Sequence, residues 1–346
     1  MWPASLRVFV FLTGIIGCLS TIQENEVVVS EVEDWPAAPI PNLGLVSGVT
    51  VNSRQQPIIF HRGPRKIKPY DSKLYNETGH FLLSHEGPIM EDTVLTLEPG
   101  SGAVLRSWGK GLFYFPHGIA VDSHDNVWLT DIALHQVMKF AENSTTPELI
   151  LGEKFSPGSE LHQFCKPTAV AISKDGNIFI ADGYCNNRIL KFDAKGNYVS
   201  QFPTQDKAPK GFHLDTPHSL AFIRGEELLC VADRENHRIL CVNMNPLHAS
   251  ETLKSITCVE KQVLGSPWAI ASRGDLLLAV NGSLPYTATS GFIIDPITTQ
   301  VISRWNPKSS SFRYAHDIAV SPDGNFMYVA EVGPSKIWKF EIKQIN

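Results

Sequence analysis

Residues 115–140 read FPHGIAVDSHDNVWLTDIALHQVMKF, and this pattern is repeated along the chain. Five further copies, some of them degenerate, occupy residues 46–63, 166–192, 216–242, 266–283 and 314–340. Each full copy contains an alternating apolar strand, a polar turn and a second apolar strand, and a third strand follows after a loop. The copies lack the 3.6-residue period of a helix, and they therefore predict an all-β chain.

The spacing of the copies predicts their arrangement in space. Equivalent positions lie about 50 residues apart, except that additional residues between 70 and 95 separate the first copy from the second. Short strands at this interval are typical of β-propeller blades, and six copies predict a six-bladed β-propeller. The strings P-x-G/A-I/L-A-V and A-D-x-x-N-x-R-I resemble the NHL family of propeller repeats. A β-sandwich with accidental similarity does not account for spacing this even.

The N-terminus has the pattern of a secretory signal peptide. A basic residue precedes the apolar run from Val8 to Leu19, which is too short to cross a bilayer, and small or polar residues follow it. A buried helix is the alternative, but the terminal position favours a signal peptide. We expect three parts: a signal peptide at residues 1–20, a lead segment at 21–43 whose residues 26–32 close the last blade, and a propeller at 44–346.

The composition is that of an ordinary globular protein. The chain has 346 residues, of which 43% are hydrophobic, and this is enough for a large core. The formal net charge of −5 gives no basic surface for nucleic acid, and no second stretch is apolar enough to span a membrane. The sequons at Asn76, Asn143 and Asn281 predict N-glycosylation in the secretory pathway.

The cysteines fit the same repeat. Cys18 lies in the signal peptide, and five others remain. Cys165 and Cys185 belong to one rim of one blade, which predicts a disulfide that fixes the loop between them. Cys230 and Cys241 lie symmetrically about a turn, across a strand pair. Cys258 is left over, either buried and free or available for an intermolecular bond.

The first strand of each blade begins at the central channel, so its first residues form a ring. In blade order the ring is Ser47, His117, Thr168, His218, Trp268 and His316. A single histidine at a strand start is more often a hydrogen-bonded structural residue. Three histidines on alternate blades instead predict a zinc site with three imidazole ligands and an open position. His124 and His135 fall outside this ring.

The loops after the second strands share the rim of the histidines. They contain His61-Arg62, Asp182 to Cys185, Asp233-Arg234 and Glu331. Arg62 and Arg234 occupy the same repeat position, and two guanidinium groups beside a metal favour an anionic substrate. Alternatively, Arg234 pairs with an acidic neighbour at the surface. Tyr184 is a candidate acid or base, or else a packed aromatic residue.

The strings IIFHRG, PHGIAVD, HQFCKPTAVAI, DGYCNNRI, CVADRENHRI and AHDIAV resemble peptidyl-α-hydroxyglycine α-amidating lyases, over about Gly44 to Phe340. The resemblance implies zinc-dependent cleavage of the N–Cα bond of a peptidyl-α-hydroxyglycine to a peptide amide and glyoxylate. This is the second step in the C-terminal amidation of secreted neuropeptides and peptide hormones. His117, His218 and His316 would bind zinc, and Tyr184 would be the base. Arg62 and Arg234 would act on the reacting glycine.

The resemblance also implies a structural calcium ion, held by backbone carbonyls of Val49 and Ile119 and by the carboxylate of Asp317. Tyr314-Ala315 stands where the family has Met-Pro before the last histidine. We expect a secreted, monofunctional monomer that depends on a separate peptidylglycine hydroxylating monooxygenase. The alternatives are a calcium-dependent, lactonase-like propeller hydrolase and a non-catalytic extracellular propeller that binds partners through its rim.

Overall fold

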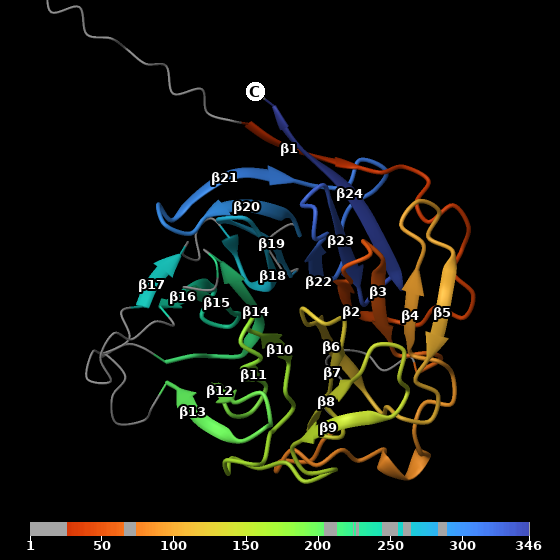
Figure 1. The fold of residues 1–346 in the computed structure, drawn as a ribbon, viewed down its shortest axis with the longest axis vertical. Coiled ribbons are helices and arrows are strands. Elements are labelled where there is room, and N and C mark those ends of the chain that lie inside the picture. Colours follow the sequence, from red (N-terminus) through yellow and green to blue (C-terminus); the bar gives the residue numbers. More distant parts are fainter. Residues whose placement is uncertain are drawn as a thin grey trace, which may run out of the picture.

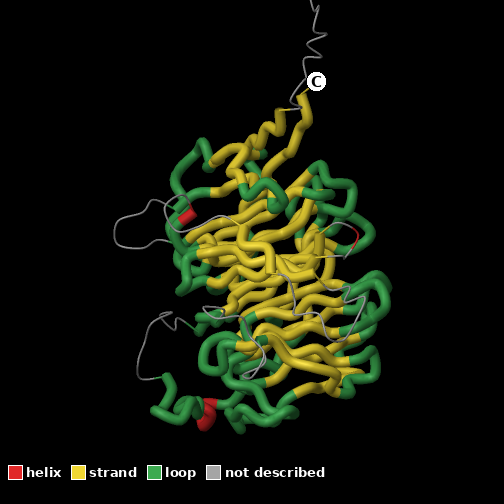
Figure 2. The backbone as a smooth tube through the Cα atoms, turned by 90° about the vertical axis from the view of Figure 1, so that its left-hand side faces the viewer, coloured by secondary structure: helices red, strands yellow, loops and turns green. Residues whose placement is uncertain are grey.

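Six antiparallel sheets of four strands each surround a central axis, and this confirms the predicted all-β, six-bladed β-propeller (Figure 1). The structure is a computed structural model that describes residues 26–65, 74–203, 213–223, 225, 228–243, 255–258, 264–282 and 289–345. The predicted signal peptide, residues 1–20, lies outside the described residues. In the side view the strands fill the middle of the molecule and the loops gather at its two faces (Figure 2).

Each blade is a meander whose first strand lies nearest the axis. Blade 1 contains β2 (Val46–Val51), β3 (Pro57–His61), β4 (Val94–Leu97) and β5 (Val104–Trp108). Blade 2 contains β6 (Pro116–Val121), β7 (Val127–Asp131), β8 (Gln136–Phe140) and β9 (Pro147–Leu151). Blade 3 contains β10 (Ala169–Ile172), β11 (Ile178–Asp182), β12 (Arg188–Phe192) and β13 (Tyr198–Phe202). Blade 4 contains β14 (Pro217–Ile223), β15 (Leu228–Asp233), β16 (Arg238–Asn243) and β17 (Ser255–Cys258).

Blade 5 contains β18 (Pro267–Arg273), β19 (Leu276–Asn281), β20 (Gly291–Asp295) and β21 (Gln300–Trp305). Blade 6 joins the two ends of the chain: β22 (Ala315–Val320), β23 (Phe326–Glu331) and β24 (Lys336–Ile345) are completed by β1 (Glu26–Glu31). β1 pairs antiparallel with β24, from Glu26 opposite Ile345 to Glu31 opposite Phe340. The ring is therefore closed by backbone hydrogen bonds between segments far apart in the sequence.

The hydrophobic core lies between neighbouring blades. Between blades 1 and 2, for example, Phe60 of β3 and Phe140 of β8 are fully buried in one cluster. Phe113 lies between them, with its ring centroid 4.9 Å from that of Phe60. Since each side of an inner strand packs on an adjacent blade, the blades hold one another around the axis.

An acidic residue at the end of the second strand fixes the loop that enters the same blade. The carboxylate of Asp131 accepts four backbone N–H bonds, from Tyr114, Phe115, Ala133 and Leu134. The equivalent acids Asp182, Asp233 and Glu331 likewise accept backbone N–H groups from the preceding loop. These carboxylates are therefore engaged in holding the rim in place.

The structure contains both disulfides, Cys165–Cys185 and Cys230–Cys241. The second joins directly opposed residues of β15 and β16. Cys258 lies in β17 opposite Ile239, and its side chain is outside the described residues. Two disulfides indicate an extracellular or secretory environment, because cytosolic thiols are kept reduced.

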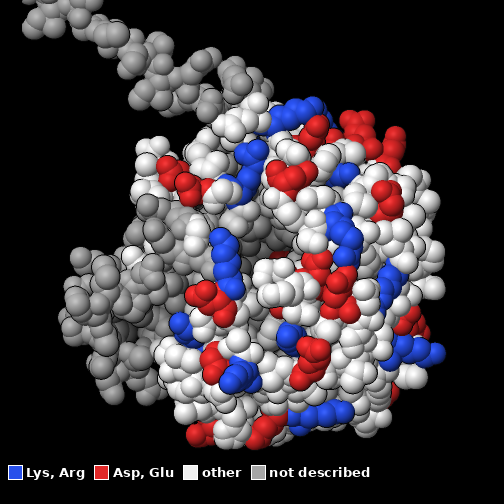
Figure 3. Space-filling model, in the orientation of Figure 1, with Lys and Arg blue, Asp and Glu red and all other residues white. Residues whose placement is uncertain are grey.

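Lysine and arginine side chains are interspersed with aspartate and glutamate on the face shown in Figure 3. Among the residues that the structure describes, no helix has the length and apolar character required to cross a bilayer.

Candidate metal centre and active site

The three predicted histidine ligands meet at the channel. His117, His218 and His316 lie at the starts of β6, β14 and β22, and each is at most 5% exposed. Their ring centroids are 4.8 to 5.0 Å apart. One nitrogen of each ring lies within 4.8 Å of the other two, which is compatible with a single metal ion between them. The repeat register thus brings together side chains about 100 residues apart in sequence.

Backbone carbonyls of the other three blades orient these rings. Nδ1 of His117 lies 2.8 Å from the carbonyl oxygen of Thr168, and Nδ1 of His218 lies 2.7 Å from that of Trp268. Nδ1 of His316 lies 2.6 Å from the carbonyl oxygen of Ser47. A carbonyl can only accept, so each Nδ1 carries the proton and each Nε2 keeps a free lone pair. Each of the three ring residues that is not a histidine therefore orients one of the three histidines through its backbone carbonyl.

Burial keeps the imidazoles neutral. It lowers the pKa of His316 to about 3, and the nearby guanidinium of Arg62 contributes to the same effect. Burial, together with the neighbouring rings and arginines, also holds the pKa values of His117 and His218 well below their usual range. Neutral imidazoles are the form that binds a metal, and the histidines are therefore ready to bind one at neutral pH.

Tyr184 reaches the same point from the loop after β11. Its hydroxyl oxygen lies 2.9 Å from Nε2 of His117 and 3.1 Å from Nε2 of His218. The Cys165–Cys185 disulfide anchors the next residue. The preceding residue is glycine because a Cβ at Gly183 would lie 2.2 Å from the carbonyl oxygen of Pro217. This close approach of two blades places the tyrosine between two of the three histidines.

Arg62 borders the centre from blade 1. It is 3% exposed, its Nε donates to the carbonyl of Pro116 at 3.1 Å, and its guanidinium carbon lies 4.2 Å from the ring centroid of Phe115. Burial lowers the pKa of Arg62 to about 10, so the group stays charged at neutral pH. Among the described residues, its buried Nη1 has no hydrogen-bond partner. Arg62 therefore has a donor left for a bound anion.

Arg234 forms the pair with an acidic neighbour that the sequence left open as one alternative, and it also lies against two aromatic rings of the site. Its Nε donates to Glu235 at 2.8 Å, as expected for a pair between neighbours in sequence. It is nevertheless only 8% exposed. Its guanidinium carbon lies 5.3 Å from the ring centroids of both Tyr184 and Trp268. Arg234 therefore places positive charge beside the phenol of Tyr184.

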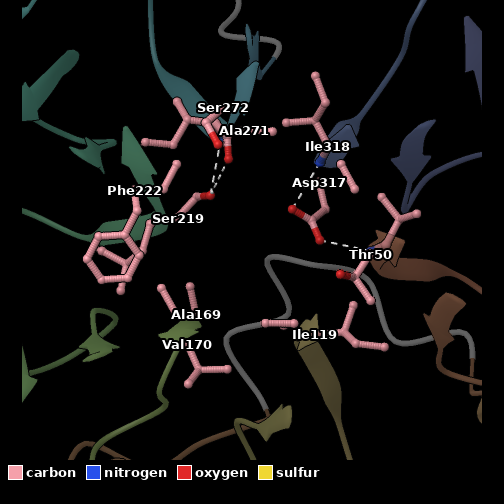
Figure 4. A pocket seen from close by; sticks show the side chains of 18 of the residues that line it. Thr50, Ile119, Ala169, Val170, Ser219, Phe222, Ala271, Ser272, Asp317 and Ile318 are labelled. Carbon is pink, nitrogen blue, oxygen red and sulfur yellow. Dashed lines mark hydrogen bonds between the residues drawn. The ribbon is translucent and has the colours of Figure 1, made fainter. Parts of the chain in front are cut away.

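The channel contains a cavity of about 480 Å³ that is lined by the inner strands (Figure 4). Asp317, the one acidic residue among its described lining residues, directs its carboxylate into this cavity. The carboxylate accepts the N–H of Val49 at 2.9 Å and that of Ile318 at 3.0 Å. Burial raises the pKa of Asp317 to about 7. Ile119 lines the cavity as well, so the three residues expected at a calcium site share one part of the channel.

The other histidines in the opening pattern lie away from this centre. His124 is exposed in the turn between β6 and β7. His135 is fully buried, and its Nδ1 accepts the N–H of Lys166 at 3.0 Å.

Tyr314, two residues before His316, is 41% exposed, and its ring lies where a side chain at Gly333 would otherwise project.

The structure argues against one of the three predicted glycosylation sites. Asn76 and Asn143 are exposed, and they stay predictions. Asn281 is 3% exposed, and its Nδ2 donates to the carbonyl of Leu264 at 3.0 Å. Because a glycan would have to be attached to that nitrogen, the expectation for Asn281 does not fit the folded protein.

The chain has clear relatives. Residues 164–192 match the NHL repeat family model. Peptidyl-alpha-hydroxyglycine alpha-amidating lyase 2 of Drosophila melanogaster is 37% identical over 89% of this chain and 74% of its own length. A probable peptidyl-alpha-hydroxyglycine alpha-amidating lyase of Caenorhabditis elegans is 35% identical over 88% of this chain and 84% of its own length. Peptidylglycine alpha-amidating monooxygenase of Rattus norvegicus is 36% identical, and this chain spans 35% of its length.

Solved structures share the fold at low sequence identity. A virginiamycin B lyase from Staphylococcus aureus matches with a TM-score of 0.52 and 13% identity, over 92% of this chain and 88% of its own. A putative gluconolactonase matches with a TM-score of 0.56 and 12% identity, over 93% of each chain. These two show the propeller fold alone. The identity to the amidating lyases, over most of both chains, shows that the chain belongs to the peptidyl-α-hydroxyglycine α-amidating lyase family of enzymes.

Proposed function

We propose that this protein cleaves the N–Cα bond of peptidyl-α-hydroxyglycines to give a peptide amide and glyoxylate. Family membership supports the reaction class. The observation that carries the proposal is the position of the Tyr184 hydroxyl, within hydrogen-bond distance of two of the three histidines that converge at the channel. A base beside a metal site is the arrangement that an α-hydroxy substrate requires.

The donor set fits zinc. Three neutral imidazoles would hold the ion through Nε2, and their Nδ1 atoms are fixed by backbone carbonyls. Hard cations such as magnesium and calcium prefer oxygen ligands, and this centre contains no carboxylate among the described residues. When bound, zinc would supply Lewis-acid polarisation of the substrate hydroxyl oxygen.

Tyr184 would accept the proton of that hydroxyl group as the general base. As the hydroxyl carbon becomes the aldehyde carbon of glyoxylate, the N–Cα bond breaks and its electron pair goes to the amide nitrogen. Tyr184 then returns the proton to that nitrogen. The substrate atoms are divided between the two products, and no further reactant is needed. The guanidinium carbon of Arg234 lies 5.3 Å from the centroid of the Tyr184 ring, so its positive charge would lie beside the group that moves the proton.

Arg62 would bind the carboxylate of the reacting glycine through its unpartnered Nη1. Its other contacts, to Pro116 and Phe115, hold the guanidinium in place. A fixed cation at this position would select substrates that end in a carboxylate, and it would compensate the negative charge that remains on glyoxylate.

We also propose which enzyme supplies the substrate of this protein and in which compartment the protein acts. The rat relative is named a monooxygenase, and a separate hydroxylase would supply the α-hydroxyglycine that this chain consumes. The disulfides and the exposed sequons at Asn76 and Asn143 support a secreted glycoprotein, which we expect to be a monomer. Its substrates would be secreted neuropeptides and peptide hormones. Residues 1–20 would be its signal peptide.

Calcium is proposed as the second ion, held by Asp317 and by carbonyls of Val49 and Ile119. A buried carboxylate without a countercharge is costly, and a bound cation would remove that cost. We expect calcium to stabilise the protein by about 2.7 kcal/mol when its free concentration is 100 times Kd. Asp317→Asn should abolish this gain, whereas the exposed Asp175→Asn should keep it. Thermal unfolding with and without calcium measures both, and an equal gain in D317N would contradict the assignment.

The central test is glyoxylate release from a peptidyl-α-hydroxyglycine. Purified protein should release stoichiometric glyoxylate and peptide amide, lose this activity with a chelator and regain it with zinc. A protein that binds the peptide without releasing glyoxylate would instead be a binding propeller. Hydrolysis of a lactone in the presence of calcium, with no glyoxylate, would indicate the hydrolase alternative. Either outcome would overturn the proposed function.

A further inference from the structure

His61 is the last residue of β3, directly before Arg62, and the proposed reaction does not use it. It is 2% exposed, and its Nδ1 accepts the backbone N–H of Gly44 at 3.2 Å and that of Gly63 at 3.1 Å. Because a backbone N–H can only donate, Nδ1 carries no proton and the ring is neutral. Burial favours this form and lowers the pKa of His61 to about 4. His61 thus ties the residue after Arg62 to the segment that leads into β2.

The two glycines bring these backbone segments into direct contact. A Cβ at Gly44 would lie 2.0 Å from the carbonyl oxygen of Gly63. Gly63 itself has a φ of +52°, in the left-handed region that favours glycine. Both residues are buried, so their N–H groups would be costly to leave without an acceptor. The turn after β3 therefore depends on the one nitrogen of His61 that accepts both of them.

The backbone of Arg62 lies between these anchored residues. Its N–H donates to the carbonyl of Leu45 at 3.0 Å. Its side chain extends towards blade 2, where the carbonyl of Pro116 accepts from Nε and the ring of Phe115 lies against the guanidinium. A long, flexible side chain presents its charge accurately only if its backbone is held as well, and a functional group has to stay within about 0.5 Å of its productive position.

His61 acts on this turn from outside the reaction centre. Successive residues of an extended chain point to opposite sides, and His61 lines a separate cavity beside Asn42 and Asp92. It is not among the described residues that line the channel. A change at His61 would therefore reach the substrate only through the turn that carries Arg62.

We propose that His61 is a positioning residue for Arg62: its Nδ1 holds the turn from which the guanidinium meets the carboxylate of the reacting hydroxyglycine. This inference rests on the proposed function and adds a residue that does not touch the substrate. The role belongs to an acceptor atom at one position, and not to the aromatic character of the ring. Variants that keep, move or remove this acceptor therefore distinguish positioning from ordinary packing.

Three substitutions at position 61 separate the acceptor from the ring. His61→Asn places an amide oxygen near the position of Nδ1, whereas His61→Gln places it near that of Nε2. His61→Leu fills a similar space and has no acceptor. The matched control is His135→Leu, which also removes a buried imidazole whose Nδ1 accepts a backbone N–H, but away from the active site.

Titration calorimetry on zinc-loaded protein measures the binding of two uncleavable probes. One is a peptide that ends in a 2-hydroxy acid, with a methylene in place of the scissile nitrogen; the other is its carboxamide. His61→Gln and His61→Leu should bind the carboxylate probe about tenfold more weakly and the carboxamide as the wild type does, because the contact weakened is the one to a charged group. KM should rise by a similar factor while kcat changes little, as expected for a loss of binding. His61→Asn and His135→Leu should keep the wild-type preference for the carboxylate.

Several outcomes would overturn the inference. These are an equal loss for both probes, no loss in His61→Gln and His61→Leu, a loss in His61→Asn as large as that in His61→Gln, or the same selective loss in His135→Leu. If His61→Leu does not fold, as judged by circular dichroism, the Gln and Asn variants provide the same comparison. A wild-type protein that binds neither probe and releases no glyoxylate would overturn the proposed function itself, and the inference with it.

Discussion

His218→Ala is expected to abolish both metal binding and glyoxylate release. Two imidazoles would remain, and the carbonyl of Trp268 would lose its donor. Metal ions stabilise developing charge by several kcal/mol, so we expect kcat/KM to fall by about a thousandfold or more. Metal content by mass spectrometry and glyoxylate release by a coupled assay measure the two effects.

The matched control for this variant is His124→Ala, in an exposed turn outside the ring. It should keep the metal and the activity of the wild-type protein. Full zinc content and full activity in His218→Ala would show that the three-histidine centre is not the active site. Circular dichroism should confirm that both variants keep the β-propeller fold.

Tyr184→Phe is expected to lower kcat by about 10² to 10⁴ while the bound metal stays in place. The substitution removes one oxygen and leaves the disulfide at Cys185, the close contact at Gly183 and all three imidazoles unchanged. KM should change little, because the loss concerns proton transfer rather than binding. Steady-state kinetics on the zinc-loaded variant provide the measurement.

A second substitution makes this result specific to the hydroxyl group at position 184. Tyr198→Phe removes the same atom from β13 and should leave kcat unchanged. If Tyr184→Phe kept its kcat, another group would have to be the base, and the contacts of Tyr184 to His117 and His218 would be structural only.

The repeat predicts more of this molecule than its individual residues do. Alignment of the six copies is enough to place His117, His218 and His316 in one ring, because a propeller converts equal spacing into rotation about an axis. It also predicts which loop carries Tyr184. The partners of the histidines could not be read in the same way, since Ser47, Thr168 and Trp268 contribute backbone carbonyls that any residue type would provide.

For two residues the sequence pattern and the structure give different information. Asn281 matches a sequon, yet it occupies the repeat position of Asp131, whose side chain is turned inward to hold a loop. The alignment therefore contained the signal that its amide is buried. Tyr75 is the opposite case. It lies in residues that interrupt the repeat, so the alignment gives it no equivalent position, and only the structure shows that it pairs with Phe81.

The hydrogen bond between His316 and Ser47 joins the last blade to the first. His316 therefore reaches its ligand orientation only when the two ends of the chain have met, and β1 and β24 hold them together. Metal affinity and circular closure are for this reason thermodynamically linked: an ion that binds only the closed ring stabilises that closure by the free energy with which it binds. In an open chain His316 would lack the carbonyl of Ser47 that orients it as the third ligand.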